Sequence, residues 1–322
     1  MKDVLVALNN VEKRFLASKK MFRENKYVHA INGISFDIRQ GETFALVGES
    51  GCGKSTTGRL INRLLEPDRG EIWFHQENIS NYSSSQMKPL RKKMQMVFQD
   101  PYGSLNPRMR ISEIVGEPLL VHTNLTAKER YRKVMDLLEI VGLNERHAQS
   151  YAHEFSGGQR QRIGIARALT VNPSLVIADE PVSALDVSIQ AQVINLFKNL
   201  QKEFQLTYLF ISHDLSVVEN ISDRIGVMYL GKIMELTSKE KLYKEPLHPY
   251  TKALLSAIPI ADPTLKRERI LLKGDIPNPI DLPSGCPFHT RCPHAFQRCV
   301  EETPELKEVK AEHKVACHLS FS

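Results

Sequence analysis

Gly48-Glu-Ser-Gly-Cys-Gly-Lys-Ser55 decides the fold of this 322-residue chain. The stretch matches the pattern G-x-x-x-x-G-K-[ST], which specifies a loop that cradles phosphate groups. Thr43-Phe-Ala-Leu-Val47 precedes it and has the unbroken apolar character of a strand buried on both faces of a parallel sheet. We therefore expect a loop that runs from a buried strand into a helix, with the phosphates at the helix N-terminus.

The positions of this loop have separate expected roles. The glycines let successive backbone N–H groups turn inward around the phosphates, Lys54 should reach the β and γ phosphates, and Ser55 should ligate Mg²⁺. Cys52 is interpreted as a small filler, with a redox role as the minor alternative. A plain glycine-rich turn is the alternative for the whole motif. The expected nucleotide-binding residues of the loop are Gly48, Glu49, Ser50, Gly51, Cys52, Gly53, Lys54, Ser55 and Thr56.

Two acids follow a second buried apolar run, Leu175-Val-Ile-Ala178. Asp179 is expected to help hold Mg²⁺, and Glu180 is expected to polarise a water for attack on the γ-phosphate, as general base. The alternative is an acidic strand end that only caps a following helix. A third run, Tyr208-Leu-Phe-Ile211, also follows helix-like sequence. Repeated βα units of this kind predict an α/β fold around one parallel sheet.

The segments around this core predict three further parts. Val4–Phe15 and Ile31–Ile38 mix β-branched, aromatic and polar residues, as half-buried antiparallel strands do. The pattern then becomes helical, most clearly between Ala127 and Val141, and the end of the chain is broken up by prolines. We expect a nucleotide-binding domain at residues 1–236, a helical insertion at about 100–164, and a small irregular cysteine-rich region at 237–322.

Composition excludes several classes of protein. A content of 42% hydrophobic and 25% charged residues is typical of globular proteins and argues against a disordered or fibrous chain. No apolar run approaches the roughly eighteen residues that cross a bilayer, and the N-terminus lacks the apolar core of a signal peptide, so we expect a cytosolic chain. The net charge of +6 suits nucleic acid, an anionic membrane surface or a phosphate ligand, and it does not decide between them.

Ser156-Gly-Gly-Gln159 lies upstream of the paired acids and resembles the signature sequence of ABC ATPases, a class of phosphate-loop NTPases. Read locally, it is a helix start with Ser156 and Gln159 as a capping box. A phosphate-loop kinase or GTPase has no such segment. The resemblance implies that Ser156, Gly157, Gly158 and Gln159 complete the nucleotide site of a partner subunit, so that ATP joins two subunits.

Other segments resemble further markers of the same family. Gln99 resembles the residue that contacts Mg²⁺ and senses the transmembrane partner, and Asp186 resembles the segment that crosses the dimer seam. His213 resembles the switch histidine beside the γ-phosphate. A lone histidine is more often structural, but its place after the third buried strand favours this role. The implied catalytic residues are Glu180, His213 and Gln99, and the implied Mg²⁺ ligands are Ser55, Gln99 and Asp179.

The aromatic residue that stacks on the adenine ring is left open between two candidates. The stretch from Phe15 to Tyr27 looks longer than the turn that the family uses there. Of the two, we favour Tyr27.

The resemblance narrows further at Gln99–Arg108, at His248-Pro-Tyr-Thr251 and in the cysteine-rich tail, which together look like the peptide-importer branch. It implies an ATP-hydrolysing subunit in which ATP closes a dimer and hydrolysis reopens it, powering uptake of oligopeptides or dipeptides. The implied partners are a second homologous ATPase, two permease subunits and an extracytoplasmic binding protein, with this chain at the cytoplasmic face of the membrane. A homodimer and a nickel importer are the alternatives.

A nucleic-acid-associated ABC ATPase is the alternative from another class, and the basic charge would permit it. Such proteins carry a long coiled coil or zinc insertion between the phosphate loop and the signature. Here roughly a hundred residues separate Lys54 from Ser156, without sustained heptads, so no nucleic-acid partner is expected.

Four of the five cysteines crowd the tail, with the spacing Cys286-x5-Cys292-x6-Cys299-x17-Cys317. In a reducing cytosol, close cysteines favour a metal over disulfides, but no Cys-x2-Cys zinc knuckle is present. The resemblance implies a [4Fe–4S] cluster on these thiolates, with zinc or unligated thiols as alternatives. The tail has many prolines and little apolar pattern, so we expect the metal to act as a structural staple.

Overall fold

The computed structural model describes residues 3–18, 25–259 and 269–321. These residues form two compact units. The phosphate-loop unit contains residues 3–39, 43–81 and 212 onward, and the helical unit contains residues 40–42 and 82–211. Within the described ranges, none of the helices has both the length and the apolar character that crossing a bilayer requires.

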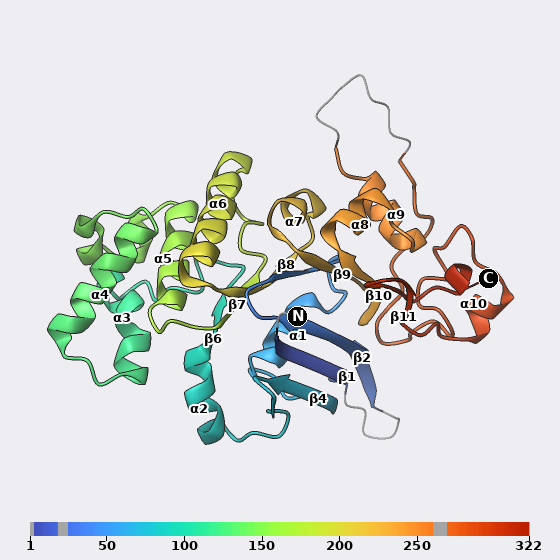
Figure 1. Cartoon of the computed structure of the whole chain (residues 1–322), viewed down its shortest axis with the longest axis horizontal. Coiled ribbons are helices and arrows are strands. Elements are labelled where there is room, and N and C mark those ends of the chain that lie inside the picture. The colour runs from blue at the N-terminus through green and yellow to red at the C-terminus, as the bar shows by residue number, and fades with distance from the viewer. Residues whose placement is uncertain (1–2, 19–24, 260–268, 322) are drawn as a thin grey trace. The chain divides into compact units, whose positions relative to one another are not determined.

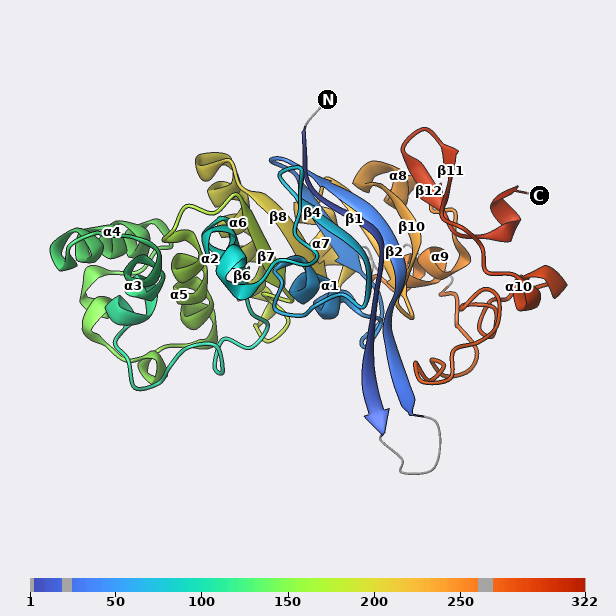
Figure 2. The same cartoon turned by 90° about the horizontal axis from the view of Figure 1, so that it is seen from below.

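The phosphate-loop unit contains an antiparallel sheet with the strand order β2-β1-β4-β5. Its strands are β1 (Val4–Ser18), β2 (Lys26–Arg39), β4 (Arg69–Phe74) and β5 (Glu77–Asn78). β1 and β2 pair along their length and form the long blue ribbon in Figure 2. The two antiparallel strands expected here are confirmed. Both are longer than expected, because backbone pairing continues beyond the half-buried part of the ribbon.

A second sheet in the same unit has the order β11-β12-β10-β9-β3. Its strands are β3 (Thr43–Val47), β9 (Arg224–Tyr229), β10 (Lys232–Ser238), β11 (Lys307–Lys310) and β12 (His313–Val315). β3 and β9 are parallel, and the other neighbours are antiparallel. All five residues of β3 are buried, as the apolar run predicted. The helices of this unit are α1 (Lys54–Ile61), α7 (Leu215–Ile221), α8 (Lys239–Lys244), α9 (Pro249–Ser256), α10 (Gln297–Glu301) and the 3-10 helix η3 (His318–Phe321).

The helical unit contains three parallel strands in the order β8-β7-β6. They are β6 (Met94–Val97), β7 (Leu175–Asp179) and β8 (Thr207–Ser212), and every residue of β7 and β8 is buried. The expected βα units are therefore confirmed. The helices are α2 (Ser84–Lys93), α3 (Ile111–His122), α4 (Ala127–Ile140), α5 (Gly157–Leu169) and α6 (Val187–Phe204), with 3-10 turns η1 (Glu145–Gln149) and η2 (Ala152–Glu154).

Helices α3, α4 and α5 pack against one another in the green part of Figure 1. The helix expected between Ala127 and Val141 is α4, and it buries Val134, Leu137 and Leu138 as a single stripe. An amphipathic helix of this kind is held by packing of its apolar face more than by its own propensity.

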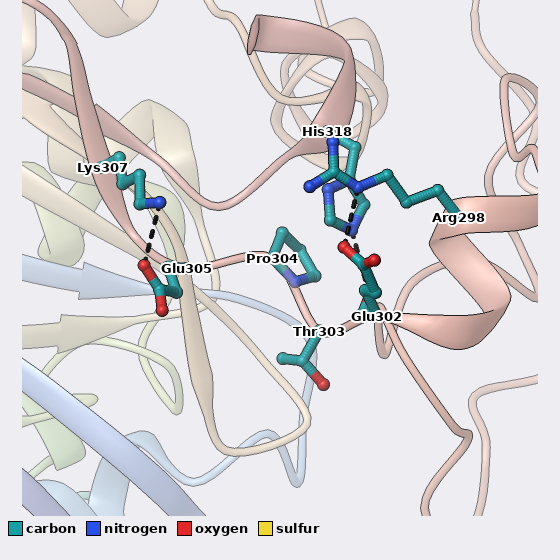
Figure 3. Close-up of a pocket in the computed structure, with 7 residues that line it drawn as sticks. All are labelled: Arg298, Glu302, Thr303, Pro304, Glu305, Lys307 and His318. Atoms are coloured by element: carbon teal, nitrogen blue, oxygen red, sulfur yellow. Dashed lines mark hydrogen bonds and ion pairs between the residues drawn. The ribbon is translucent and has the colours of Figure 1, made fainter.

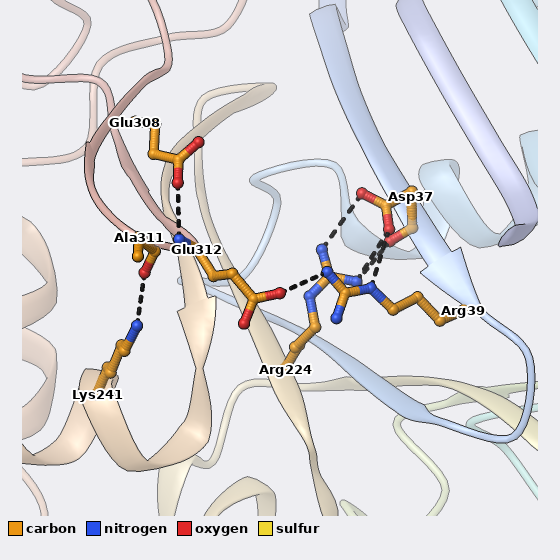
Figure 4. A network of polar contacts seen from close by, with 7 residues as sticks. All are labelled: Asp37, Arg39, Arg224, Lys241, Glu308, Ala311 and Glu312. Atoms are coloured by element: carbon orange, nitrogen blue, oxygen red, sulfur yellow. Dashed lines mark hydrogen bonds and ion pairs between the residues drawn. The ribbon is translucent and has the colours of Figure 1, made fainter. Parts of the chain in front are cut away.

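Within the phosphate-loop unit, strand pairing and ion pairs hold the C-terminal hairpin of β11 and β12. β12 pairs with β10, and Glu312, in the turn between β11 and β12, accepts a hydrogen bond of 2.8 Å from Arg39 of β2 (Figure 4). Beside it, Arg224 of β9 donates to both carboxylate oxygens of Asp37, at 3.1 and 3.3 Å. The Arg39–Glu312 pair is mostly exposed and contributes little, so strand pairing is the main anchor of this hairpin.

A buried carboxylate, Glu235 on β10, joins α9 to β12. Its oxygens accept hydrogen bonds from the backbone N–H groups of Leu247 and His248 at 2.8 and 3.0 Å. The Nε2 atom of His313 on β12 lies 2.7 Å from the same carboxylate. Burial raises the pKa of Glu235, but the hydrogen bonds, led by that from His313, outweigh burial and lower the pKa. The charged carboxylate is therefore the stable form in the folded chain.

We expect the free energy of unfolding to fall as the pH is lowered from about 6.5 to about 4, because of His248. Its side chain is 1% exposed, and burial lowers its pKa to about 4. The unfolded chain, with a histidine pKa of about 6.5, binds more protons in this window, so stability present above pH 6.5 is lost on acidification. The full loss is about 3 kcal/mol.

Urea denaturation at about pH 7 and about pH 4.5 measures this loss. The control is His248→Asn, because asparagine can also cap α9, where His248 Nδ1 accepts the N–H of Tyr250 at 3.0 Å. The variant should lose less stability over this range than the natural chain. The same loss in both chains would show that His248 is not the titrating group.

Candidate active site

The phosphate loop runs from β3 into α1 and is closely packed by neighbouring backbone. A Cβ atom on Gly48 would lie 2.1 Å from the carbonyl oxygen of Met228 on β9, and one on Gly53 would lie 2.4 Å from that of Ala30 on β2. Gly53 also has φ of 107°, a conformation that favours glycine. Packing therefore requires both glycines, in addition to any contact with phosphate.

Lys54, the first residue of α1, turns back across the loop. Its Nζ donates to the carbonyl oxygens of Gly48 at 2.8 Å and Glu49 at 3.1 Å. The residue is only 4% exposed, so its ammonium charge is directed at the loop and not at solvent. Along the rest of the loop, Ser50 and Gly51 are exposed, and Ser55 and Thr56 are half-buried at the start of α1.

Cys52 is buried inside the loop, with 4% exposure. Burial raises the pKa of its thiol, although the nearby Lys54 charge acts in the opposite direction. A thiol that stays protonated is a poor nucleophile, which argues for the filler role and against a redox role.

The two adenine-stacking candidates, Phe15 and Tyr27, lie on opposite faces of the β1–β2 ribbon. Tyr27 pairs with the residue after Phe15, and directly opposed residues share a face. Lys13 shares the face of Phe15 and pairs with Ile31. The Cδ1 atom of Ile31 would lie 2.9 Å from a Cβ on Gly53. Phe15 is therefore on the face that packs against the phosphate loop, and Tyr27 is on the other.

Phe15, and not Tyr27, for which we expected the stacking role, thus lies on the loop side of the ribbon. The physical reason is a β-bulge: β2 has one extra residue, Ala30, between the partners of Lys13 and Arg14. An extra residue in one strand reverses the side to which all earlier residues of that strand point. The alternation of the sequence alone does not reveal this.

His213 immediately follows β8, as expected, and is exposed. The next residue, Asp214, caps α7 by accepting the N–H of Ser216 at 2.8 Å. This cap fixes the backbone beside His213.

Glu180 directly follows β7 in the helical unit and has an unusual backbone. Its φ of 46° is left-handed, which strains a residue that carries a side chain. Its N–H donates to the carbonyl oxygen of Ile211 at 3.0 Å, and Gln99 Nε2 donates to its Oε2 at 2.9 Å. Asp179 is only 2% exposed, whereas Glu180 is half-buried. The structure thus brings Gln99 and Glu180 together. It also gives the two adjacent acids different environments, because Asp179 is buried and Glu180 is partly open to solvent.

Ser156 caps α5. Its side chain accepts the N–H of Gln159, and Gln159 Oε1 accepts the N–H of Ser156 at 3.0 Å. The predicted capping box is confirmed. A Cβ on Gly158 would lie 2.5 Å from Cγ2 of Ile189, so glycine is needed where α5 approaches α6. Ser156 is exposed, which leaves the start of α5 accessible to a partner.

Two further features lie in the helical unit with Ser156: a contact between Arg160 and Tyr102, and the exposed start of α6. Arg160 of α5 lies 4.1 Å from the ring centroid of Tyr102, which links the loop after Gln99 to the signature helix. Sequence reasoning missed this pair, although Tyr102 stands in the quoted Gln99–Arg108 stretch. At the start of α6, Asp186 is exposed and its side chain makes no capping hydrogen bond, and Val187 is 81% exposed.

The four tail cysteines gather in one region. Cys286, Cys299 and Cys317 are buried, and the Cys286 N–H donates to the carbonyl oxygen of Cys299 at 2.8 Å. Burial, reinforced by the three other tail thiols, raises the pKa of Cys286 to about 12. In the part of the chain that the structure describes, no group of three or more His, Cys, Asp or Glu side chains is arranged to hold a metal ion. The metal site therefore stays a prediction.

A pocket of about 300 Å³ lies beside these cysteines (Figure 3). Its acids are paired: Glu302 accepts from Arg298 at 2.7 Å, and Glu305 lies 3.0 Å from Lys307. Both ion pairs are exposed. Both acids that line the pocket therefore have basic partners.

Comparison with known proteins gives two matching families and close relatives. Residues 31–183 match the family "ABC transporter", and residues 234–299 match "Oligopeptide/dipeptide transporter, C-terminal region". The oligopeptide transport ATP-binding protein AppF of Bacillus subtilis is 58% identical over 321 residues, which is 98% of each chain. The di/tripeptide transport ATP-binding protein DppF of Pseudomonas aeruginosa is 48% identical, over 99% of this chain and 98% of its own length.

A likeness to solved structures agrees with this. The dimeric structure of the ATP-binding cassette MJ0796 bound to ADP and Pi is similar to this chain with a TM-score of 0.65 and 30% identity. The match covers 73% of this chain and 99% of that one.

Proposed function

This chain belongs to the ABC transporter family, in its oligopeptide and dipeptide branch, and from that premise we propose how its residues divide the work of ATP hydrolysis. It is the ATP-binding and ATP-hydrolysing subunit of a peptide importer. The oligopeptide/dipeptide C-terminal region favours peptides over nickel as the cargo. The observation that carries the proposed mechanism is the hydrogen bond between Gln99 and Glu180.

ATP is held by the phosphate loop in this proposal. The backbone N–H groups of the loop and the start of α1 receive the phosphates, and Lys54 exchanges its carbonyl partners for phosphate oxygens. Phe15, on the face of the ribbon that packs against the loop, is the better adenine-stacking residue than Tyr27.

Mg²⁺ suits the donors that the chain offers, because hydroxyl, amide and carboxylate oxygens are the ligands it prefers. Ser55, Asp179 and Gln99 are the proposed ligands. The Nε2 atom of Gln99 donates to Glu180, which leaves the Oε1 atom as the one that can face a cation. When bound, Mg²⁺ neutralises charge that develops on the phosphates.

Glu180 is the proposed general base. Its carboxylate accepts the proton of the attacking water, and Gln99 fixes the direction in which the carboxylate points. The strained φ of 46° also turns Glu180 away from the path of the strand, so the two adjacent acids serve different atoms. His213 is the proposed contact to the γ-phosphate and the catalytic water.

The chain acts in a pair, with Ser156, Gly157, Gly158 and Gln159 serving the partner's ATP. Support comes from the exposed Ser156 at the start of α5, and from Asp186 and the 81% exposed Val187, which a partner could cover. The solved cassette MJ0796 is dimeric. A homologous second ATPase is the proposed partner in the importer, and a homodimer is the alternative for the isolated chain.

Mixing two inactive variants should restore part of the ATPase activity. In a Lys54→Ala and Ser156→Arg pair, one of the two sites keeps both an intact loop and an intact signature. An equal mixture should recover roughly a quarter of the natural turnover, because half of the pairs are mixed and each has one good site. The release of phosphate measures this turnover, at chain concentrations high enough for ATP to bring two chains together. Mixing Lys54→Ala with Glu180→Gln is the control and should recover no activity, because both lesions act in the chain's own site. A Lys54→Ala and Ser156→Arg mixture that recovers no activity would speak against a shared site.

A groove in the helical unit supports contact with permease subunits. It has a volume of about 500 Å³ between α3 and α4, and Leu120 and Tyr131 on its rim are 63% and 42% exposed. Exposed apolar side chains around a groove are typical of docking surfaces. We propose that one permease subunit docks there, so that this chain and its partner ATPase together dock on two permeases at the cytoplasmic face of the membrane, with an extracytoplasmic binding protein delivering the peptide.

The cysteine tail is proposed to hold a [4Fe–4S] cluster as a structural staple. Support comes from the four thiols that gather in one region and from their chemistry, because thiolates are the ligands of iron–sulfur clusters. No step of ATP hydrolysis depends on this cluster.

We expect about four iron and four sulfide per chain purified without oxygen. Replacing Cys292 or Cys299 by serine should remove them, whereas Cys52→Ser, outside the tail, should retain them. Iron, sulfide and zinc analysis with an absorption spectrum measures this. Zinc alone would recast the tail as a zinc site, and a metal-free chain with full ATPase activity would refute a resident metal.

A further inference from the structure

The phosphate loop is tied to the C-terminal region at Glu49, a contact that the proposed mechanism does not use. Arg291 Nη1 and Nη2 donate to the two carboxylate oxygens of Glu49, at 2.7 and 3.1 Å. This bidentate geometry is the strong form of an arginine–carboxylate pair. The side chains of Arg291 and Glu49 are 9% and 25% exposed, so solvent screens the pair less than it screens surface pairs.

The backbone of Glu49 is held from the same region. The Glu49 N–H donates to the hydroxyl of Tyr250, on α9, at 3.0 Å. Tyr250 is fully buried, so the position of this hydroxyl is set by packing. The Nζ atom of Lys54 donates to the Glu49 carbonyl oxygen at 3.1 Å. The side chain, N–H and carbonyl of Glu49 therefore all have partners, and the C-terminal region supplies two of them.

An aromatic cluster sets the position of Arg291. Phe288, three residues earlier, is 1% exposed and packs on Tyr229 and Tyr250, with ring centroids 5.4 and 5.3 Å apart. The Arg291 N–H donates to the Phe288 carbonyl oxygen at 3.0 Å, which closes the turn. Its guanidinium also reaches the Tyr229 hydroxyl at 3.5 Å. The guanidinium is thus built into the unit and is not a mobile surface charge.

We propose that Arg291 is a positioning residue for ATP binding: it neutralises the Glu49 carboxylate inside the phosphate loop and holds that corner of the loop in place. This inference rests on the proposed function of the loop. Without Arg291, the Glu49 charge would be uncompensated in a loop that must accept the negative phosphates of ATP, and it would oppose their binding. The C-terminal region thereby controls the affinity of the nucleotide site.

The test compares ATP affinity by titration calorimetry in four full-length chains. Arg291→Gln should weaken ATP binding about fivefold to tenfold, in the range expected for a coupled pair. The double variant Arg291→Gln/Glu49→Gln should bind more tightly than Arg291→Gln alone, because the uncompensated charge is gone. The matched control is Arg298→Gln, since Arg298 also directly precedes a tail cysteine and pairs with a carboxylate, but its side chain is 58% exposed (Figure 3). It should bind ATP as the natural chain does.

Several readouts separate positioning from general stability. In Arg291→Gln the KM for ATP should rise with a smaller change in kcat. The loss of ATP affinity should be smaller at high salt, because salt screens the charge of Glu49. Arg291→Lys keeps the positive charge but cannot make the bidentate contact. Its ATP affinity should lie between those of the natural chain and of Arg291→Gln. If Arg291→Gln folds poorly, this lysine variant and the double variant carry the test.

Two results would overturn the inference. One is equal ATP affinity of Arg291→Gln and Arg298→Gln, and the other is a double variant as weak as Arg291→Gln. In either case the natural chain still binds ATP. A natural chain that does not bind ATP would instead refute the proposed function of the loop.

Discussion

Replacing Glu180 by glutamine should lower ATP turnover at least about 100-fold while ATP binding persists. Glutamine has nearly the same shape but cannot accept a proton from the attacking water. The Gln99 amide that now donates to the Glu180 carboxylate can still donate to the glutamine carbonyl oxygen, so the loop geometry should remain. Binding energy is therefore retained and only the chemical step is lost.

Steady-state phosphate release and equilibrium ATP binding measure these two properties. The control is Glu203→Gln, the same substitution at an exposed position on α6 in the same unit. It should leave turnover within about twofold, as surface substitutions do. If Glu180→Gln kept normal turnover, Glu180 would not be the base, and an equal loss in both variants would point to instability.

Replacing Lys54 by alanine should weaken ATP binding at least about tenfold, because a charge-assisted hydrogen bond contributes about 1.5–3 kcal/mol. Lys54 is 4% exposed, and its Nζ atom donates a hydrogen bond of 2.8 Å to the Gly48 carbonyl oxygen. Its ammonium group is therefore already held over the loop. The variant should fail at binding, in contrast to Glu180→Gln, which should fail at turnover.

Calorimetric titration with ATP and Mg²⁺ checks this loss. Lys307→Ala is the matched control, since the Lys307 side chain is 61% exposed and pairs with Glu305 outside the phosphate loop. Its affinity should equal that of the natural chain. ATP affinity that survives in Lys54→Ala would refute the role of the loop lysine.

Much of the fold was predictable because it depends on residues that lie close together in the sequence. The buried strands β3, β7 and β8 are short apolar runs, and α4 shows its stripe directly in the spacing of Val134, Leu137 and Leu138. The loop glycines and the Ser156 capping box also depend on neighbours in sequence. Such features need no knowledge of the tertiary structure.

Contacts between distant segments were not predictable. Gln99 and Glu180 are 81 residues apart, and Arg291 and Glu49 are 242 apart, so no window of sequence contains either pair. The strands β11 and β12 are short and largely polar, and they form because a partner strand is available. The bulge at Ala30 likewise appears only in the pairing of β1 with β2, and it changes which aromatic faces the loop.

ATP hydrolysis by this chain should drive peptide uptake. The most direct test replaces the natural chain in its own cells by the Glu180→Gln or Glu203→Gln variant and measures entry of a labelled dipeptide, a labelled oligopeptide and radioactive nickel. Glu180→Gln should abolish peptide uptake at unchanged protein level, Glu203→Gln should not, and nickel uptake should be unaffected in both. Peptide uptake that continues with Glu180→Gln, or a loss confined to nickel, would contradict this role of the chain.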